Sequence, residues 1–445
     1  MHTLSCGITR GNAMIDLSTT RRLLQSSVGL LLLLPCFAQA ADSPTLNTGD
    51  TAWVLIATAL VLMMTIPGLA LFYSGMVRKK NILGTMAHSY GATAMVSVLW
   101  VLCGYSLAFG SSDMNAWVGG FNHVLLGNIS PNDLTGTIPT LLFVTFQMTF
   151  AIITVAILAG AIAERIKFSS FMVFVGLWVV VVYAPVCHWV WGGGWLMADG
   201  ALDFAGGTVV HINAGVAGIV LAAVLGKRKG YHRESMAPSN LALTLIGTGL
   251  LWVGWFGFNG GSALAANALA ANALLVTQVA AAAGALAWFF IERLTRGKAS
   301  VLGGASGAIA GLVGITPAAG FVSVGGALMI GILTSVVCFY SVNYLKHWLK
   351  VDDSLDAFGL HGVGGIVGAV LTAVFVNPII TGKPLALPML TQVWVQIEGV
   401  LAVAIYSALF TFLIAKAIEA TMGLRVNDED EYVGLDIAVH GERLD

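Results

Sequence analysis

The stretch from Asp203 to Gly218 reads D-F-A-G-G-T-V-V-H-I-N-A-G-V-A-G, and it decides the fold class. No Asp, Glu, Lys or Arg occurs from Phe204 to Gly226, so this segment is long and apolar enough to cross a bilayer as a helix. It nevertheless carries one histidine, His211, well inside the apolar run. Polar groups at membrane depth are costly and usually line a pathway, so His211 is a candidate functional residue.

The same pattern returns later in the chain. Asp353 stands eight residues before His361, as Asp203 stands before His211, and glycines follow each histidine at the fourth and seventh positions. Glycine is common throughout the chain, so the shared Asp-to-His spacing carries more weight than the glycines. Two histidines placed by an internal duplication predict one site at the junction of two repeats.

The composition excludes a soluble globular protein. The chain is 57% hydrophobic and 10% charged, whereas soluble domains carry about 25% charged residues. The net charge of -1, without a basic patch beyond short loops, gives no reason to expect a nucleic-acid partner. The cysteines lack metal-ligand or redox spacing and are interpreted as small packing residues: Cys6, Cys36, Cys103, Cys187 and Cys338.

Charge-free intervals predict eleven membrane helices, and hence an all-α polytopic membrane protein. The intervals are Thr51–Val77, Asn81–Ser112, Leu134–Ala163, Phe168–Ala198, Phe204–Gly226, Ser235–Ile291 (two spans, broken near Asn259), Ala299–Leu345 (two spans, broken near Thr316), Ala357–Gly382 and Pro384–Ala415, the last of which contains one charged residue, Glu398. Basic residues follow the odd-numbered spans, and Lys383 alone follows an even one. The positive-inside rule therefore places the amino terminus outside and the carboxyl terminus inside. Five spans per repeat is an odd number, so the second repeat must be inverted.

The first forty residues resemble a secretory signal peptide. Arg21 and Arg22 precede a short apolar core, and Ala38-Gln39-Ala40 forms a cleavage site. Either Met1 or Met14 is the start, and an uncleaved first anchor is the alternative. We therefore expect a signal peptide at 1–40 and a membrane domain at 41–422. Within that domain we expect repeats at about 51–226 and 235–382 and a final helix at about 390–420.

The remaining segment, 423–445, is a polar and acidic tail on the predicted cytoplasmic side. Two interpretations stay open for it: a solvated, disordered end, or a docking surface for a cytoplasmic regulator.

Aromatic and hydroxyl side chains gather at the predicted outer ends of several spans. Phe150 lies within the third span, Trp191 opens W-G-G-G-W, and Phe258 and Ser262 belong to G-F-N-G-G-S. Aromatic faces beside a hydroxyl suit a small cation, because each ring attracts it by roughly 0.5–2 kcal/mol. Ordinary core or interfacial packing is the alternative for each of these aromatic residues.

Together these motifs resemble the ammonium transporter (Amt/MEP/Rh) family, and within it the bacterial AmtB type. The resemblance includes F-G-L-H-G-V-G-G and the early P-G-L-A-L-F-Y-S-G-M-V-R-K-K-N, and it covers essentially the whole mature chain. It implies eleven helices with a five-plus-five inverted repeat in a homotrimer. It also implies no enzymatic activity, no cofactor or metal, a bacterial (Gram-negative) inner-membrane location, and a tail that docks a PII-type (GlnK-like) regulator in nitrogen metabolism.

The resemblance also assigns roles to individual residues. Phe150, Trp191 and Ser262 match the outer site that recruits ammonium, and Phe150 with Phe258 matches the pair of rings that closes the pore. His211 and His361 match the twin histidines of the pore, where burial favours neutral imidazoles. The acid near the site is Asp203, for which helix capping and attraction of the ion are both open. We expect Asp203→Asn to preserve most of the cap.

The expected activity is recruitment of ammonium, its deprotonation and conduction of ammonia, with coupled proton transfer by the histidines as an option. Two other classes of function stay open. An intramembrane metalloenzyme would need a third ligand beside the two histidines, and the sequence contains no H-E-x-x-H motif. An ammonium receptor would bind the ion without conducting it.

Overall fold

The computed structural model describes residues 45–444, and everything below concerns this part of the chain. The predicted signal peptide at 1–40 lies outside the described residues. From Leu46 onward the chain forms one compact unit. Its α-helices are α2 (Thr48–Met63), α3 (Ala70–Met76), α4 (Ile82–Leu99), α5 (Tyr105–Phe109), α6 (Thr140–Ile162), α7 (Phe168–Trp178), α8 (Ala184–Trp191), α9 (Trp195–Ala198), α10 (Asn213–Leu225), α11 (Leu241–Trp255), α12 (Ala268–Arg296), α13 (Val301–Ile315), α14 (Val324–Tyr340), α15 (Lys346–Leu349), α16 (Val363–Phe375), α17 (Pro378–Thr381), α18 (Met389–Thr421), α19 (Asp428–Val433) and α20 (Leu435–His440).

Several neighbouring helices are joined into longer rods by π-helical turns, in which the backbone hydrogen bond spans one residue more than in an α-helix. These turns are Met64–Leu69, Trp100–Gly104, Val179–Tyr183, Gly207–Ile212, Phe256–Gly260, Ser341–Leu345 and Phe358–Gly362. Two short 3₁₀ turns, Lys79–Asn81 and Val124–Leu126, lie in loops or at a helix start. The strands β1 (Leu134–Thr135) and β2 (Ile138–Pro139) form a small antiparallel hairpin before α6.

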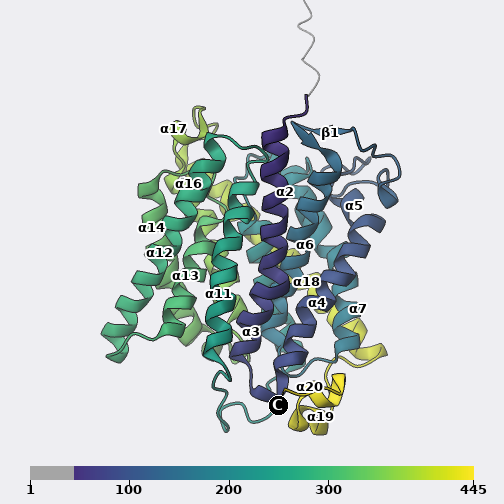
Figure 1. The fold of residues 1–445 in the computed structure, drawn as a ribbon, viewed down its shortest axis with the longest axis vertical. Coiled ribbons are helices and arrows are strands. Elements are labelled where there is room, and N and C mark those ends of the chain that lie inside the picture. Colours follow the sequence, from purple (N-terminus) through teal and green to yellow (C-terminus); the bar gives the residue numbers. More distant parts are fainter. Residues whose placement is uncertain (1–44, 445) are drawn as a thin grey trace, which may run out of the picture. The chain divides into compact units, whose positions relative to one another are not determined.

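The number of membrane helices agrees with the sequence prediction. Among residues 45–444, ten continuous helices are long and apolar enough to cross a membrane, and α13, with 15 residues, is a shorter apolar helix. The predicted breaks near Asn259 and Thr316 are confirmed, because helical structure ends at Gly260 and Ile315. The chain is therefore an all-α polytopic membrane protein (Figure 1).

The hairpin β1–β2 and the tail helices α19 and α20 lie at opposite ends of the bundle (Figure 1). Following the predicted orientation, we call the hairpin end outer and the tail end inner. Helix α6 connects the two ends, since it begins beside β2 and ends at Ile162. Helix α10 packs along α6 and α18, and α16 packs between α14 and α18, so both repeats contact the last long helix.

The two histidine-bearing segments run in opposite directions, as an inverted repeat requires. Asp203 accepts a hydrogen bond from Trp191 at the outer end. The segment after Asp353 bonds to the inner end of α6, where the Ser354 N–H donates to the Ala161 carbonyl at 3.2 Å. The segments cross at Gly215, where an added Cβ would lie 2.3 Å from the Gly362 nitrogen. Only glycine permits this approach of the two backbones.

The tail is folded against the inner end of the bundle, so the interpretation of a solvated, disordered end is wrong. The carboxylate of Glu431 is 1% exposed and accepts hydrogen bonds from the Lys229 N–H and from Arg425. Asp436 accepts from the Gly84 N–H at 2.8 Å, in the first turn of α4. Glu431 and Asp436 therefore accept hydrogen bonds from backbone N–H groups far away in the sequence, while Asp428 and Glu429 stay exposed.

Candidate functional site

Three of the sequence-predicted site residues lie in π-helical turns. His211 belongs to the turn Gly207–Ile212, His361 to Phe358–Gly362 and Phe258 to Phe256–Gly260. Such turns widen a helix locally and are frequent at functional sites, because they redirect side chains that a regular helix would point elsewhere. Here they bring side chains from three separate helices to the centre of the bundle.

Asp203 holds the start of the first histidine segment. Its carboxylate accepts four backbone hydrogen bonds, from the N–H groups of residues 206 to 209, at distances of 2.7 to 3.2 Å. The chain can turn into this arrangement because Gly206 adopts a φ of 114°, in the left-handed region. The geometry is that of the helix cap that the sequence predicted. Its backbone carbonyl also accepts the indole N–H of Trp191 at 2.8 Å, which fixes the orientation of that ring.

The structure corrects one expectation about this cap. Both carboxylate oxygens of Asp203 accept two N–H groups each. An asparagine offers only one oxygen, and its amide NH₂ would face the other two N–H donors. Asp203→Asn therefore removes half of the cap instead of preserving most of it.

Asp353 caps the second histidine segment less completely. It accepts two hydrogen bonds, from the N–H groups of Ala357 and Phe358. The neighbouring carboxylate of Asp356 pairs with Lys346 at 2.6 Å. Burial, and then the negative charge of Asp356, raise the pKa of Asp353 to about 6.

The two histidines meet at the centre of the bundle. The Nδ1 atoms of His211 and His361 lie 3.2 Å apart, and the rings are 1% and 4% exposed. While both rings are neutral, one Nδ1 must donate and the other accept. The ring that donates at Nδ1 has an acceptor at Nε2, and the other ring has a donor there. The pair therefore presents one donor and one acceptor to its surroundings, and the buried Nε2 of His211 has no partner among the described residues.

A series of aromatic rings leads from the histidines to the outer end. The ring of His211 lies 6.0 Å from Phe258, Phe258 lies 4.3 Å from Phe150, and Phe150 lies 5.8 Å from Trp191 at a nearly perpendicular angle, all measured between ring centroids. Phe150 and Phe258 are buried, and their rings pack against each other at a tilt of 31° between Trp191 and His211.

Cavities on either side of these rings outline a path through the bundle. An outer cavity of about 340 Å³ is lined by Trp191, Phe150 and Ser262 together with apolar neighbours. Beyond Phe258, a cavity of only about 10 Å³ lies against both histidines, which is room for about one water molecule. Its other lining residues are Met64, Leu69, Phe72, Ile153, Ile157, Leu251, Trp255, Phe258 and Ile309. The indole N–H of Trp255 is used by Thr316, so the imidazoles supply the free polar atoms of this cavity among the described residues.

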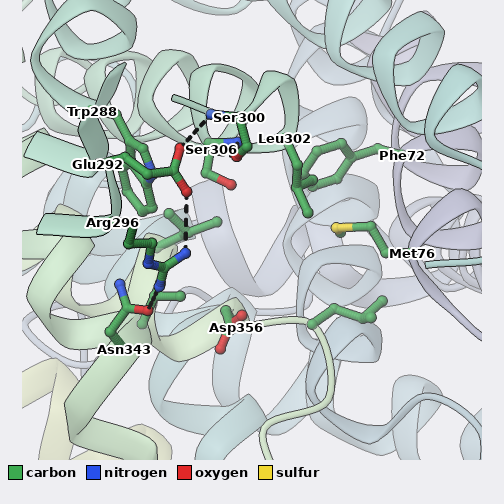
Figure 2. A pocket seen from close by; sticks show the side chains of 14 residues that line it. Phe72, Met76, Trp288, Glu292, Arg296, Ser300, Leu302, Ser306, Asn343 and Asp356 are labelled. Carbon is green, nitrogen blue, oxygen red and sulfur yellow. Dashed lines mark hydrogen bonds and ion pairs between the residues drawn. The ribbon is translucent and has the colours of Figure 1, made fainter. Parts of the chain in front are cut away.

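On the inner side, Phe72 also borders a cavity of about 140 Å³ (Figure 2). This inner cavity is charged, unlike the outer one. Glu292 accepts hydrogen bonds from Ser300 and forms an ion pair with Arg296 at 3.1 Å, and Asp356 faces the cavity from another segment (Figure 2). Water and ions therefore find polar partners at the inner end.

The structure brings together all the predicted site residues, and it adds three that the sequence analysis missed. Phe72 and Trp255 line the small cavity, and Gln147 lines the outer one. Phe72 stood within the quoted motif P-G-L-A-L-F-Y-S-G, but nothing in its spacing marked it as facing the path. Within residues 45–444, no three His, Cys, Asp or Glu side chains gather as metal ligands would, so nothing there favours the metalloenzyme alternative.

Comparison with known proteins assigns the family. The profile of the Ammonium Transporter Family matches residues 52–444, which include the whole site. The chain is 50% identical over 419 residues to an ammonium transporter of Aquifex aeolicus, covering 94% of this chain and 98% of that protein. It is 47% identical over 403 residues to an ammonium transporter of Bacillus subtilis, covering 89% of this chain and 98% of that protein.

A solved structure agrees with these sequence comparisons. The crystal structure of Saccharomyces cerevisiae Mep2 superimposes with a TM-score of 0.80 at 36% identity, covering 86% of this chain and 89% of Mep2. The matched fold, the buried histidine pair and the relatives at about half identity lead to one conclusion. The chain belongs to the ammonium transporter family, as a multi-pass membrane transporter of ammonium and not an enzyme.

Proposed function

We propose that the protein recruits ammonium at the outer cavity, removes a proton there, and conducts neutral ammonia past the two histidines. In this proposal Trp191, Phe150 and Ser262 bind the ion, and Phe150 with Phe258 forms the gate. His211 and His361 line the conducting path, and Asp203 holds the outer segment in place. The single observation that carries the proposal is the small cavity of about 10 Å³, in which the imidazoles are the polar groups of an otherwise apolar lining.

Magnitudes favour ammonia over ammonium as the conducted species. Moving a small ion from water into a low-dielectric interior costs on the order of 20 kcal/mol in the idealised limit. Three cation–π contacts return at most about 6 kcal/mol. Removing the proton from an amine with a lysine-like pKa of about 10.4 costs roughly 4.6 kcal/mol at pH 7. Deprotonation is therefore the lower barrier, and potassium, which has no proton to lose, is rejected.

The histidine pair suits the passage of ammonia. Ammonia both donates and accepts hydrogen bonds, and the neutral pair offers one acceptor and one donor at its two Nε2 atoms. The shared hydrogen bond at 3.2 Å also provides a route by which a proton passes from one ring to the other with an exchange of tautomers. Such a relay takes up the proton that ammonium loses on the outer side, releases it on the inner side, and so makes the net transport electrogenic. The alternative is that the rings only line the path.

The remaining assignments of this proposal rest on the family resemblance. They are a cleaved signal peptide at 1–40, a membrane domain at 41–422 and a regulatory tail at 423–445. The protein forms a homotrimer in the inner membrane of a Gram-negative bacterium, with its amino terminus outside. A PII-type (GlnK-like) regulator docks at the inner face, which the folded tail helps to form.

Uptake of radiolabelled methylammonium into proteoliposomes tests this function. A transporter accumulates the label inside the vesicles, in proportion to the imposed gradient, and unlabelled ammonium competes with it. A receptor that binds methylammonium without conducting it would retain no more label than the number of binding sites in the vesicles. That second outcome would overturn the proposal.

A further inference from the structure

Two histidines that the proposed transport does not use lie beside each other at the inner end of the bundle, and we call them the inner histidine pair. His232 belongs to the loop 226–240, between α10 and α11, and His347 belongs to α15. Their ring centroids lie 5.5 Å apart, and the ring planes differ by 35°. Both side chains are exposed, and no hydrogen bond or ion pair with another described residue engages their ring nitrogens. These nitrogens are therefore available to a ligand.

The backbones that carry the two rings are anchored on the same short segment, 352–356. Arg228, four residues before the first ring, donates to the carboxylate of Asp352 through its backbone N–H, its Nε and its Nη2, each at 2.9 Å. Lys346, directly before the second ring, pairs with Asp356 at 2.6 Å. The fold therefore holds the two rings near each other, and both neighbouring cations are already neutralised by a carboxylate.

The separation of the rings fits a metal ion that they share. A zinc ion lies about 2.0–2.1 Å from a coordinating imidazole nitrogen, and hence about 3.2 Å from the centre of that ring. At a tetrahedral angle of about 109°, two rings on one ion have centres about 5.2 Å apart. The observed 5.5 Å differs from this value by a few tenths of an ångström. Rotation of the two exposed side chains, which is fast and local, is enough to aim one nitrogen of each at a common point.

The surroundings of the pair have room for the rest of a coordination shell. Both rings line a cavity of about 420 Å³, which also contains the carboxylate of Glu234 in its lining. Within residues 45–444 no third His, Cys, Asp or Glu side chain joins the pair as a metal ligand. Water molecules must therefore complete the shell, and the ion is held less tightly than in a structural zinc site with four protein ligands.

We propose that His232 and His347 together bind one divalent transition-metal ion, represented by zinc, and that the bound ion slows transport at the inner end. Neutral imidazole suits zinc, copper and nickel, whereas magnesium and calcium prefer oxygen ligands. The metal site itself stands on the geometry of the two rings. Its effect on transport rests on the function proposed above.

The cavities connect the metal site with the transport path. The cavity of the inner histidine pair and the inner cavity of about 140 Å³ share four lining residues: Met76, Leu302, Leu355 and Asp356. The inner cavity in turn borders Phe72, which also lines the small cavity at the pore histidines. The path outlined by the cavities therefore reaches the inner histidine pair, and a metal ion there ties the loop 226–240 to α15 across the exit.

Calorimetric titration of the purified protein, free of any polyhistidine tag, with zinc tests the binding. His232→Asn and His347→Asn each remove one imidazole, and asparagine tolerates the left-handed φ of 64° at position 232. His123→Asn is the matched control, because its ring lies in an outer loop and bonds with Asn128. We expect the wild type and the control to bind one zinc ion per chain, and either variant to bind it at least about tenfold more weakly. Equal affinity in the wild type and both variants would overturn the inference.

Uptake of radiolabelled methylammonium into proteoliposomes, with zinc on both sides of the membrane, tests the effect on transport. We expect zinc to slow uptake by the wild type and by His123→Asn. Either variant of the inner pair should need at least about tenfold more zinc for half inhibition, while its rate without zinc stays within about twofold of the wild type. Zinc binding that leaves uptake unchanged would overturn the proposed effect at the exit. Absence of uptake by the zinc-free wild type would overturn the proposed function, and calorimetry would then still decide the metal site.

Discussion

The two acid–histidine segments share their spacing but not their surroundings. Asp203 accepts four backbone hydrogen bonds beside an uncharged, aromatic cavity. Asp353 accepts two, and it lies beside the charged pair of Asp356 and Lys346. The duplication thus kept the histidines and the caps, while the two ends diverged. In the function proposed above, selection of the cation therefore belongs to the uncharged outer end, and the charged inner end only needs to return the guest to water.

The largest difference between the segments should appear in stability. Asp203→Asn leaves two buried N–H donors without an acceptor, and each costs about 1–3 kcal/mol, so we expect a loss of about 3 kcal/mol. Asp353→Asn keeps one acceptor and removes a repulsion from Asp356, so its effect at pH 7 should stay within about 1 kcal/mol. Thermal unfolding of both variants in detergent measures this difference. Equal losses would show that the two caps are equivalent after all.

Substitution of His211 and His361 tests whether the two histidine-bearing segments act together in transport. Because the Nδ1–Nδ1 hydrogen bond needs both rings, His211→Ala and His361→Ala should each reduce the ammonium-evoked current at least about tenfold, or about 1.4 kcal/mol. The double variant should lose little more, because residues that act together are not additive. Unchanged current and selectivity in both single variants would remove the histidines from the mechanism.

Substitutions at the outer and inner cavities should also differ in their effect on the binding of ammonium. Trp191→Leu removes a cation–π contact worth roughly 0.5–2 kcal/mol, so we expect a rise of about fivefold in the inhibition constant of ammonium. Arg296→Gln, at the inner cavity, should change that constant less than about twofold, since exposed ion pairs contribute little. Competition against methylammonium uptake measures both. A larger effect of Arg296→Gln than of Trp191→Leu would contradict the proposal that ammonium is selected at the outer cavity.

The smallest predicted effect is on the pH dependence of stability. The pKa of Asp353 is raised to about 6 in the folded protein, so the folded state binds its proton more tightly than the unfolded state does. The protonated carboxyl of Asp353 therefore stabilises the folded protein at low pH, and this contribution to the free energy of unfolding is lost as the pH rises through about 6.

The free energy of unfolding of Asp353→Asn, relative to that of the wild type, should accordingly rise by about 1 kcal/mol between pH 5 and pH 7. Thermal unfolding of both proteins at the two pH values measures this change. Asp352 provides the control with opposite sign, because its hydrogen bonds and ion pair with Arg228 lower its pKa below the usual range. A relative stability of Asp353→Asn that stays constant with pH would show that this carboxyl is not protonated in the folded state.

Much of the fold could be read from the sequence, because its signals are local. Charge-free intervals predicted the membrane helices, and the repeated Asp-to-His spacing predicted that two segments meet. The sequence did not reveal the folding of the tail, since Glu431 and Asp436 bind backbone donors at Lys229 and Gly84, hundreds of residues earlier. It did not mark Gln147 either, because an amide in an apolar helix carries no information about which cavity it faces until neighbouring helices are placed.

The account depends most on the claim that the path past the histidines admits an uncharged guest and rejects ions that cannot lose a proton. Charge movement in proteoliposomes holding the wild-type protein tests it most directly, with pulses of ammonium and of potassium at equal concentration. Because the histidine pair in this account relays the proton that ammonium loses, the account predicts a current on addition of ammonium and none on addition of potassium. A potassium current of similar size would contradict it, because that ion can cross only through a hydrated channel.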